Sequence, residues 1–128
     1  VDQAFLGSCA SGRLEDIAAA AAILKGRKVH PDVRFIVTAG SREVLKAASR
    51  LGCIEALHEA NAIVTSAGCG ACPGSSGGIL APGEIAISCN TRNFEDRMGA
   101  KAQIFLASPA TVAASAIEGC ITSPVGYL

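Results

Sequence analysis

The sequence predicts an α/β fold, a three-layer α/β/α sandwich built on a mostly parallel sheet. Two observations lead to this prediction. Short apolar segments rich in β-branched residues alternate with stretches whose apolar residues recur at helical spacing. Glycines and capping residues separate the two kinds of segment. Strands joined through helices imply right-handed crossovers and parallel pairing, and we expect helices on both faces of such a sheet.

Five short apolar segments are predicted to be strands, at residues 3–6, 33–38, 62–66, 84–88 and 103–107. The first helix opens at Ser11 and Gly12, carries apolar residues at helical spacing and stops at Gly26. The second helix begins at a Ser41 cap and ends at Gly52. The apolar residues of both helices are assigned to the core.

The third helix is predicted at residues 54–60, and the last one runs from the Ser108-Pro109 pair to Gly119. Half of the 128 residues are hydrophobic, which suffices for one core, so residues 1–128 are predicted to form a single domain. The chain opens at Val1 without an initiator Met and soon enters a strand that needs neighbours. We therefore expect a fragment of a larger subunit.

Composition excludes several classes of function. Lys and Arg total 11 and so do Asp and Glu, so no long-range field of one sign would attract nucleic acid or an anionic membrane. Stacking platforms for single-stranded nucleic acid are also scarce, because the chain has no Trp and only one Tyr. No stretch approaches the ~18 apolar residues of a membrane span, and no signal peptide is visible. We expect a cytoplasmic protein that binds neither nucleic acid nor membrane.

Thiols and guanidiniums follow three of the predicted strands. Cys9 follows the first strand, and Cys69 and Cys72 follow the third. Arg92 and Arg97 follow the fourth. Because the carboxyl ends of parallel strands meet at one edge, where open α/β sheets bind ligands, we expect these five side chains to converge.

Three converging cysteines favour a metal centre, since thiolates are soft ligands for iron–sulfur clusters and zinc. A structural zinc site needs four protein ligands, and neither His30 nor His58, interpreted as surface residues, is a convincing fourth. A cubane cluster with three cysteine ligands keeps one iron open as a Lewis acid. The guanidinium forks of Arg92 and Arg97 would then suit the carboxylates of a di- or tricarboxylic acid.

Other features near these residues are assigned no ligand. The glycine-rich residues 74–78 lack the Lys and the spacing of a phosphate-binding loop. The remaining cysteines, Cys53, Cys89 and Cys120, are predicted to fill the core.

The sequence resembles the aconitase superfamily over nearly its whole length, and most of all the large subunits of 3-isopropylmalate dehydratase and homoaconitase, in their third domain. The resemblance is carried by five ordered motifs: Asp2-Gln3 through Gly7-Ser8-Cys9, Arg13-Leu14-Glu15-Asp16, Gly68-Cys69-Gly70-Ala71-Cys72, Arg92-Asn93-Phe94-Glu95-Asp96-Arg97 and Ser108-Pro109-Ala110. It implies that Cys9, Cys69 and Cys72 are the ligands of a 4Fe-4S cluster. It also implies that Arg92 and Arg97 belong to the substrate site.

The same resemblance implies a hydro-lyase that dehydrates and rehydrates a carboxylic hydroxy acid such as 3-isopropylmalate, with a place in leucine biosynthesis. The family's catalytic serine base and His-Asp pairs lie on other domains, so no catalytic residue is expected in this chain. A complete active site would need the remaining domains of the large subunit and a small subunit or swivelling domain. The isolated chain is expected to be inactive.

The sequence departs from the family pattern at Ala10 and Ser11, where Thr-Asn is usual, and at Thr91 and Pro73. Two alternatives to a hydro-lyase domain follow. One is a non-catalytic iron–sulfur module with a sensing or regulatory role, and the other is a thiol redox module built on the CxxC motif, in which Cys9 would be idle.

Overall fold

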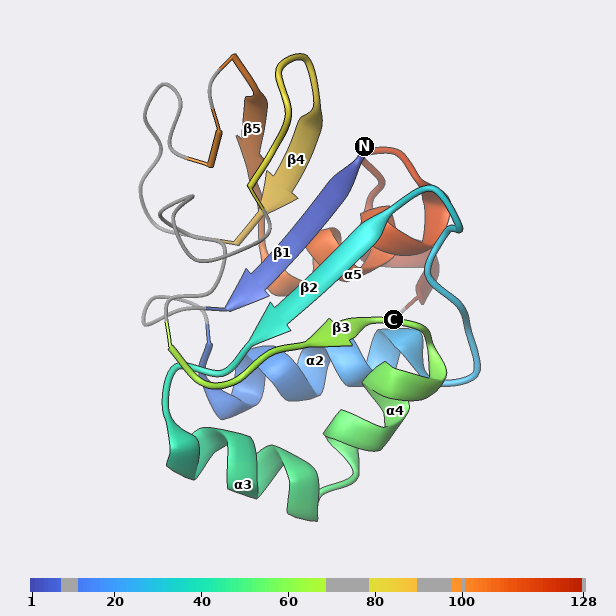
Figure 1. The fold of residues 1–128 in the computed structure, drawn as a ribbon. Helices are drawn as coiled ribbons and strands as arrows, with labels where there is room; N and C mark the ends of the chain where they lie inside the picture. The colour runs from blue at the N-terminus through green and yellow to red at the C-terminus, as the bar shows by residue number, and fades with distance from the viewer. Residues whose placement is uncertain (8–11, 69–78, 90–97, 100, 128) are drawn as a thin grey trace.

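A parallel five-stranded sheet forms the centre of the computed structural model, which describes residues 1–7, 12–68, 79–89, 98–99 and 101–127 (Figure 1). Its strands are β1 (Gln3–Gly7), β2 (Arg34–Thr38), β3 (Ile63–Val64), β4 (Ile85–Ser88) and β5 (Gln103–Leu106). Their order across the sheet is β3-β2-β1-β4-β5, and every pairing is parallel. The predicted α/β class and the parallel sheet are confirmed.

Helices pack in one layer against one face of this sheet (Figure 1). They are α2 (Leu14–Leu24), α3 (Arg42–Arg50), α4 (Cys53–Glu59) and α5 (Pro109–Glu118), and a 3-10 turn η1 (Pro124–Tyr127) follows. Ala4 and Leu6 of β1 point into the main core under these helices, which also holds the wholly buried Ile17 and Leu57. Burying each large side chain there stabilises the fold by roughly 1.5–3 kcal/mol.

The opposite face of the sheet carries a smaller apolar cluster. Phe5 of β1 points to this side because successive side chains of a strand alternate. Leu80 and Met98, both buried, cover it from outside the sheet, and Ile36 and Ala86 complete the cluster. Helices were expected on both faces of the sheet. Among the described residues, this second face is covered by Leu80 and Met98 and not by a helix.

The local signals predicted from the sequence act as expected at the start of α3 and at both ends of α5. The Ser41 hydroxyl accepts a hydrogen bond from the Val44 N–H at 3.2 Å and caps α3. Ser108 caps α5 in the same way, and Gly119 ends α5 with a left-handed φ of 81°. Strand β3 is shorter than the predicted 62–66, because only Ile63 and Val64 pair with residues of β2.

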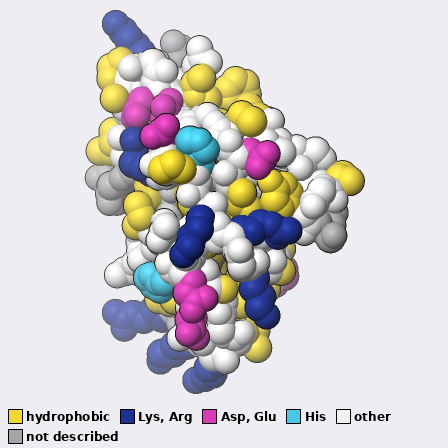
Figure 2. Space-filling view, turned by 90° about the vertical axis from the view of Figure 1, so that its right-hand side faces the viewer, with side chains coloured by type: hydrophobic (Ala, Val, Ile, Leu, Met, Phe, Trp, Pro, Cys, Tyr) yellow, Lys and Arg dark blue, Asp and Glu magenta, His cyan; other side chains and the backbone are white. Residues whose placement is uncertain are grey.

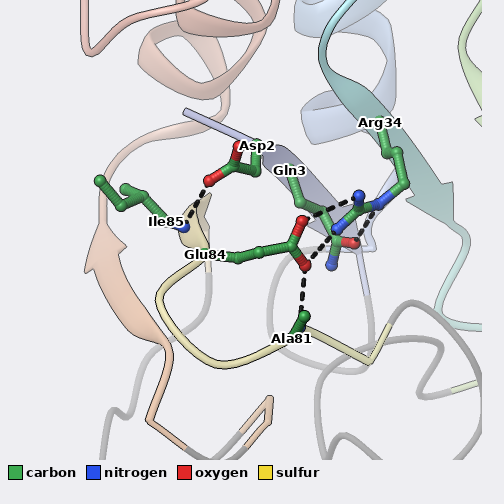
Figure 3. A network of polar contacts seen from close by, with 6 residues as sticks. All are labelled: Asp2, Gln3, Arg34, Ala81, Glu84 and Ile85. Atoms are coloured by element: carbon green, nitrogen blue, oxygen red, sulfur yellow. Dashed lines mark hydrogen bonds and ion pairs between the residues drawn. The ribbon is translucent and has the colours of Figure 1, made fainter.

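A polar network fastens the amino ends of three neighbouring strands. The Arg34 guanidinium on β2 forms a two-pronged ion pair with Glu84, just before β4, at 2.9 and 3.1 Å. It also donates to the Gln3 side chain on β1 at 3.1 Å. The hydrogen bonds from Arg34 and from the Ala81 N–H lower the pKa of Glu84. Figure 3 shows the whole network, which joins Asp2, Gln3, Arg34, Ala81, Glu84 and Ile85.

Charges of both signs are interspersed over the face of the molecule shown in Figure 2, with apolar side chains between them. This distribution agrees with the equal numbers of basic and acidic residues in the sequence. Among the described residues, no helix is long and apolar enough to cross a membrane.

Candidate metal centre at the carboxyl edge of the sheet

The five predicted site residues, Cys9, Cys69, Cys72, Arg92 and Arg97, lie outside the described residues. They belong to three segments, residues 8–11, 69–78 and 90–97. The departures from the family pattern at positions 10, 11, 73 and 91 lie in the same segments. The structure does describe the residues that flank each segment, and these flanks show how the sheet holds the ends of all three.

Segment 8–11 begins at the carboxyl end of β1. Gly7 pairs with Thr38 of β2, and a Cβ atom on Gly7 would lie 2.1 Å from the Thr38 carbonyl oxygen. Only glycine fits this close approach, and its φ of 148° is one that other residues rarely adopt. At the far end of the segment, the Gly12 carbonyl accepts a hydrogen bond from the Gly40 N–H at 2.9 Å. Both flanks therefore lie against the exit of β2.

Segment 69–78 begins beside the same exit. The Gly68 N–H donates to the Ala39 carbonyl at 3.0 Å. Three residues earlier, the Thr65 N–H donates to the Val37 carbonyl at 3.0 Å. The Thr65 hydroxyl also lies 2.5 Å from the hydroxyl of Thr38. The chain is thus fastened to β2 at two points just before the CxxC motif.

Segment 90–97 begins at the carboxyl end of β4, where the Cys89 N–H donates to the Phe5 carbonyl of β1 at 3.2 Å. Its far flank meets the far flank of segment 69–78. The Met98 carbonyl accepts a hydrogen bond from the Leu80 N–H at 2.8 Å, and a Cβ atom on Gly99 would lie 2.2 Å from the Leu80 oxygen. The residues that follow the two segments therefore lie side by side.

Strand order brings these starting points together. Strand β1 lies between β2 and β4, so the three starts spread over three neighbouring strands at one edge. Neighbouring strands are about 4.8 Å apart, so the edge in question is roughly 10 Å wide. The chain runs from β1 to β2 on one side and reaches β4 on the other, which makes the β1–β4 boundary a topological switch point. Ligand sites of open parallel sheets lie at such points.

Helix termini add a favourable field at this edge. α2, α3 and α5 each follow a strand directly, so their amino ends point to the carboxyl edge of the sheet. Helix amino ends carry a partial positive charge that favours thiolates and carboxylates. Arg13, the N-cap residue of α2, makes no side-chain cap and instead pairs with Glu15 at 3.5 Å and with Asp16 at 3.3 Å.

The other titratable candidates lie elsewhere. His58 is exposed on α4, and His30 is half-buried and accepts a hydrogen bond from the Asp32 N–H at 3.1 Å. Among the described residues, no group of three His, Cys, Asp or Glu side chains is arranged to hold a metal ion.

The three remaining cysteines do not share one environment. Cys53 and Cys89 are buried, as predicted, and Cys89 immediately precedes segment 90–97 in the sequence. The prediction is wrong for Cys120, which is exposed because it lies beyond Gly119, where α5 ends. Its sulfur lies 3.4 Å from the Thr122 hydroxyl.

Comparison with known proteins decides the family. Residues 1–119 match the aconitase family (aconitate hydratase). This chain belongs to the aconitase family. The 3-isopropylmalate dehydratase large subunit of Mycolicibacterium smegmatis is 52% identical to it over 123 residues, which is 95% of this chain and 29% of that protein.

Homoaconitase subunits are similarly close to this aconitase-family chain. The homoaconitase large subunit of Thermus thermophilus is 51% identical over 125 residues, 97% of this chain and 30% of that protein. The probable methanogen homoaconitase large subunit of Methanothermobacter thermautotrophicus is 52% identical over 97% of this chain and 29% of its own length. The chain thus spans about three tenths of these relatives, and its resemblance to hydro-lyase large subunits is confirmed.

Sequence reasoning missed two residues of this aconitase-family edge, Thr38 and Thr65. A hydroxyl residue near a strand end is common, so neither stood out. The only signal in the sequence was their position, since each lies near the carboxyl end of a predicted strand; that the two strands are neighbours is known only from the structure.

Proposed function

We propose that this chain is the iron–sulfur domain of an aconitase-type hydro-lyase and that Cys9, Cys69 and Cys72 hold a 4Fe-4S cluster. The observation that carries the proposal concerns the residues that flank these three segments: their hydrogen bonds place them at the carboxyl ends of neighbouring strands, along one edge of the sheet. Three thiols from two of these segments are a donor set that suits iron. The family membership and the positive helix ends at the same edge support it.

Within this proposal the chain supplies ligands and substrate contacts. When bound, a cluster with three cysteine ligands offers an open iron that acts as a Lewis acid on a hydroxyl or carboxylate oxygen. The roles of Arg92 and Arg97 are to hold substrate carboxylates through paired N–H groups, which orients the acid for loss and return of water. The helix amino ends at the same edge favour the negative charge of thiolates and carboxylates alike.

The substrate we propose is a di- or tricarboxylic hydroxy acid such as 3-isopropylmalate, in line with the names of the relatives. Because the chain spans about three tenths of those relatives, we propose that residues 1–128 are one domain of a longer large subunit. The groups that remove and return protons would come from the rest of that subunit and from a small subunit or swivelling domain. A cytoplasmic location fits the proposal, because free thiolate ligands persist in a reducing compartment.

Anaerobic reconstitution with iron and sulfide tests the metal centre. We expect a brown protein with four irons per chain, as the proposed cubane requires, and loss of the colour when Cys9, Cys69 or Cys72 is replaced by Ser. Cys120→Ser is the matched control, because this exposed thiol lies beyond α5 and should leave iron uptake unchanged. A colourless wild-type product would contradict the proposal.

Activity is tested after the metal centre. Supplied with the complementing domains, the loaded chain should hydrate the dehydrated acid, and Arg92→Lys should raise KM more than tenfold, because a point charge replaces a bidentate fork. A loaded chain without activity in this mixture would favour a sensing module. A reversible disulfide between Cys69 and Cys72 without iron uptake would favour thiol redox chemistry.

A further inference from the structure

Two buried or half-buried hydroxyls meet at the edge where the metal centre is proposed. Thr38 ends β2 and is completely buried, yet its side chain is polar. Its Oγ1 lies 2.5 Å from Oγ1 of Thr65, which follows the end of β3. A buried hydroxyl without a partner costs free energy, so Thr65 is what makes a polar residue tolerable at position 38.

The direction of this bond follows from counting protons. Each threonine hydroxyl has one proton to donate and can accept more than one bond. The Thr65 hydroxyl donates to the Ser66 carbonyl at 3.0 Å. Its proton is then used, so Thr38 donates to Thr65. The Thr38 hydroxyl thus donates its proton to Thr65, which lies in the stretch of chain that leads to the CxxC motif.

Thr38 also touches the segment that leads to Cys9. Its carbonyl faces Gly7 so closely that no Cβ atom fits between them. On its other side, the backbone bonds from Thr65 to Val37 and from Gly68 to Ala39 run alongside the hydroxyl pair. Thr38 therefore contacts both Gly7, the last residue before segment 8–11, and Thr65, which lies between β3 and segment 69–78.

We propose that Thr38 is a positioning residue that sets the spacing between the segment with Cys9 and the segment with Cys69 and Cys72. This inference rests on the proposed cluster-binding function. Valine has nearly the same shape as threonine, so simple packing would be served as well by an apolar residue. A hydrogen bond between hydroxyls is directional, and it fixes the separation of the two backbone stretches in a way that an apolar contact does not. Ligands offered at the right separation hold a cluster more firmly.

The test uses the full-length natural protein that contains these residues, and its cluster is reconstituted anaerobically. Thr38→Val removes the hydroxyl and keeps the volume. We expect its cluster to lose iron to a chelator about fivefold faster than wild type, the factor that one hydrogen bond of about 1 kcal/mol would give. After one-electron reduction with dithionite, which makes the 4Fe-4S cluster paramagnetic, its electron paramagnetic resonance signal should also be broader than that of wild type, because the ligand geometry is less uniform. Thr38→Ser keeps the hydroxyl and should restore both properties.

Two further variants separate positioning from general stability. Thr65→Val removes the same hydrogen bond by changing its half-buried partner. Because both substitutions remove one shared bond, the Thr38→Val/Thr65→Val double variant should release iron no faster than either single variant. Ser115→Ala is the matched control: its hydroxyl is also completely buried and accepts from the Thr122 N–H at 2.9 Å, but it lies in α5. It should lower the unfolding midpoint and leave the rate of iron loss unchanged.

The outcomes distinguish the two proposals. If the wild-type protein takes up no cluster, the proposed function fails and this inference fails with it. If the wild type is loaded but Thr38→Val and Thr65→Val release iron at the wild-type rate with an unchanged signal, only the positioning role is overturned. Equal acceleration in Ser115→Ala would also overturn it, since loss of any buried hydrogen bond would then suffice.

Discussion

Gly7 is the last residue of β1 and pairs with Thr38, the last residue of β2. Its backbone has a positive φ, and the Thr38 carbonyl fills the space that a side chain would need. Neither requirement can be relieved by a rotamer change, because both involve main-chain atoms. The glycine therefore fixes how the chain enters segment 8–11, two residues before Cys9.

Gly7→Ala should destabilise the fold by roughly 2–4 kcal/mol, because an unfavourable φ adds to a backbone clash. Gly26→Ala is the control: Gly26 also has a positive φ, 76°, but no atom lies within 4 Å of the methyl group that this substitution would add. It should cost only about 1 kcal/mol. Chemical denaturation of both variants measures the difference, and equal losses would show that the close approach to β2 does not matter.

The thiols of the candidate site were predictable because a CxxC motif and a lone cysteine after another strand form an unusual pattern. The contacts around Thr38 were not, since they depend on which strands are neighbours. That order, with β1 in the middle, is a property of the folded sheet. Sequence alone therefore led to the proposed donor atoms, which lie outside the described residues, while the contacts of the flanking residues became visible only in the structure.

At the scale of the elements, predictions were best where the physics is local. Caps such as Ser41 and Ser108 act within one helical turn, so their positions in the sequence predicted the starts of α3 and α5. The turn η1 was missed because it depends on distant partners. The Tyr127 hydroxyl donates to Glu118 at 2.7 Å, and the Arg27 guanidinium lies 4.7 Å from its ring centroid.

The amino edge of the sheet should respond to acid through Glu84. Its pKa is lowered in the folded state, mainly by the hydrogen bonds from Arg34, so the unfolded state takes up a proton first as the pH falls. The stabilisation is present above the unfolded glutamate pKa of about 4.3 and is lost as the pH falls through the lower folded value.

Glu84→Gln should therefore flatten the dependence of stability on pH below about pH 4.5, and leave its shape near pH 7 unchanged. Urea midpoints measured from pH 3 to pH 7 test this. Glu55→Gln, at an exposed position of α4 far from this network, is the control and should keep the wild-type slope. If Glu84→Gln keeps the wild-type slope of stability against pH, the Arg34–Glu84 ion pair is not the source of that slope.

Across the whole molecule, the two edges of the sheet are held by different means. At the amino edge, the network around Arg34 is formed by side chains of the chain itself. At the carboxyl edge, the described bonds are mostly between backbone groups of the loops, and the proposed cluster would join two of those loops. Cys9 and Cys69 are separated in the sequence by α2, β2, α3, α4 and β3. A cluster bound to both would therefore close a large part of the chain into a loop.

Removing the cluster should therefore loosen one edge and spare the other. In hydrogen exchange of the loaded and the chelator-stripped protein, we expect faster exchange after stripping at the amides of Gly40, Gly68 and Cys89, whose bonds close the carboxyl edge. The amides of Asp2 and Arg34, bonded across the amino edge, should change much less. Ligand binding stabilises the state that holds it, so a uniform rise in exchange would mean that the metal stabilises only the fold as a whole. No change at either edge would mean that the cluster is not held at this edge.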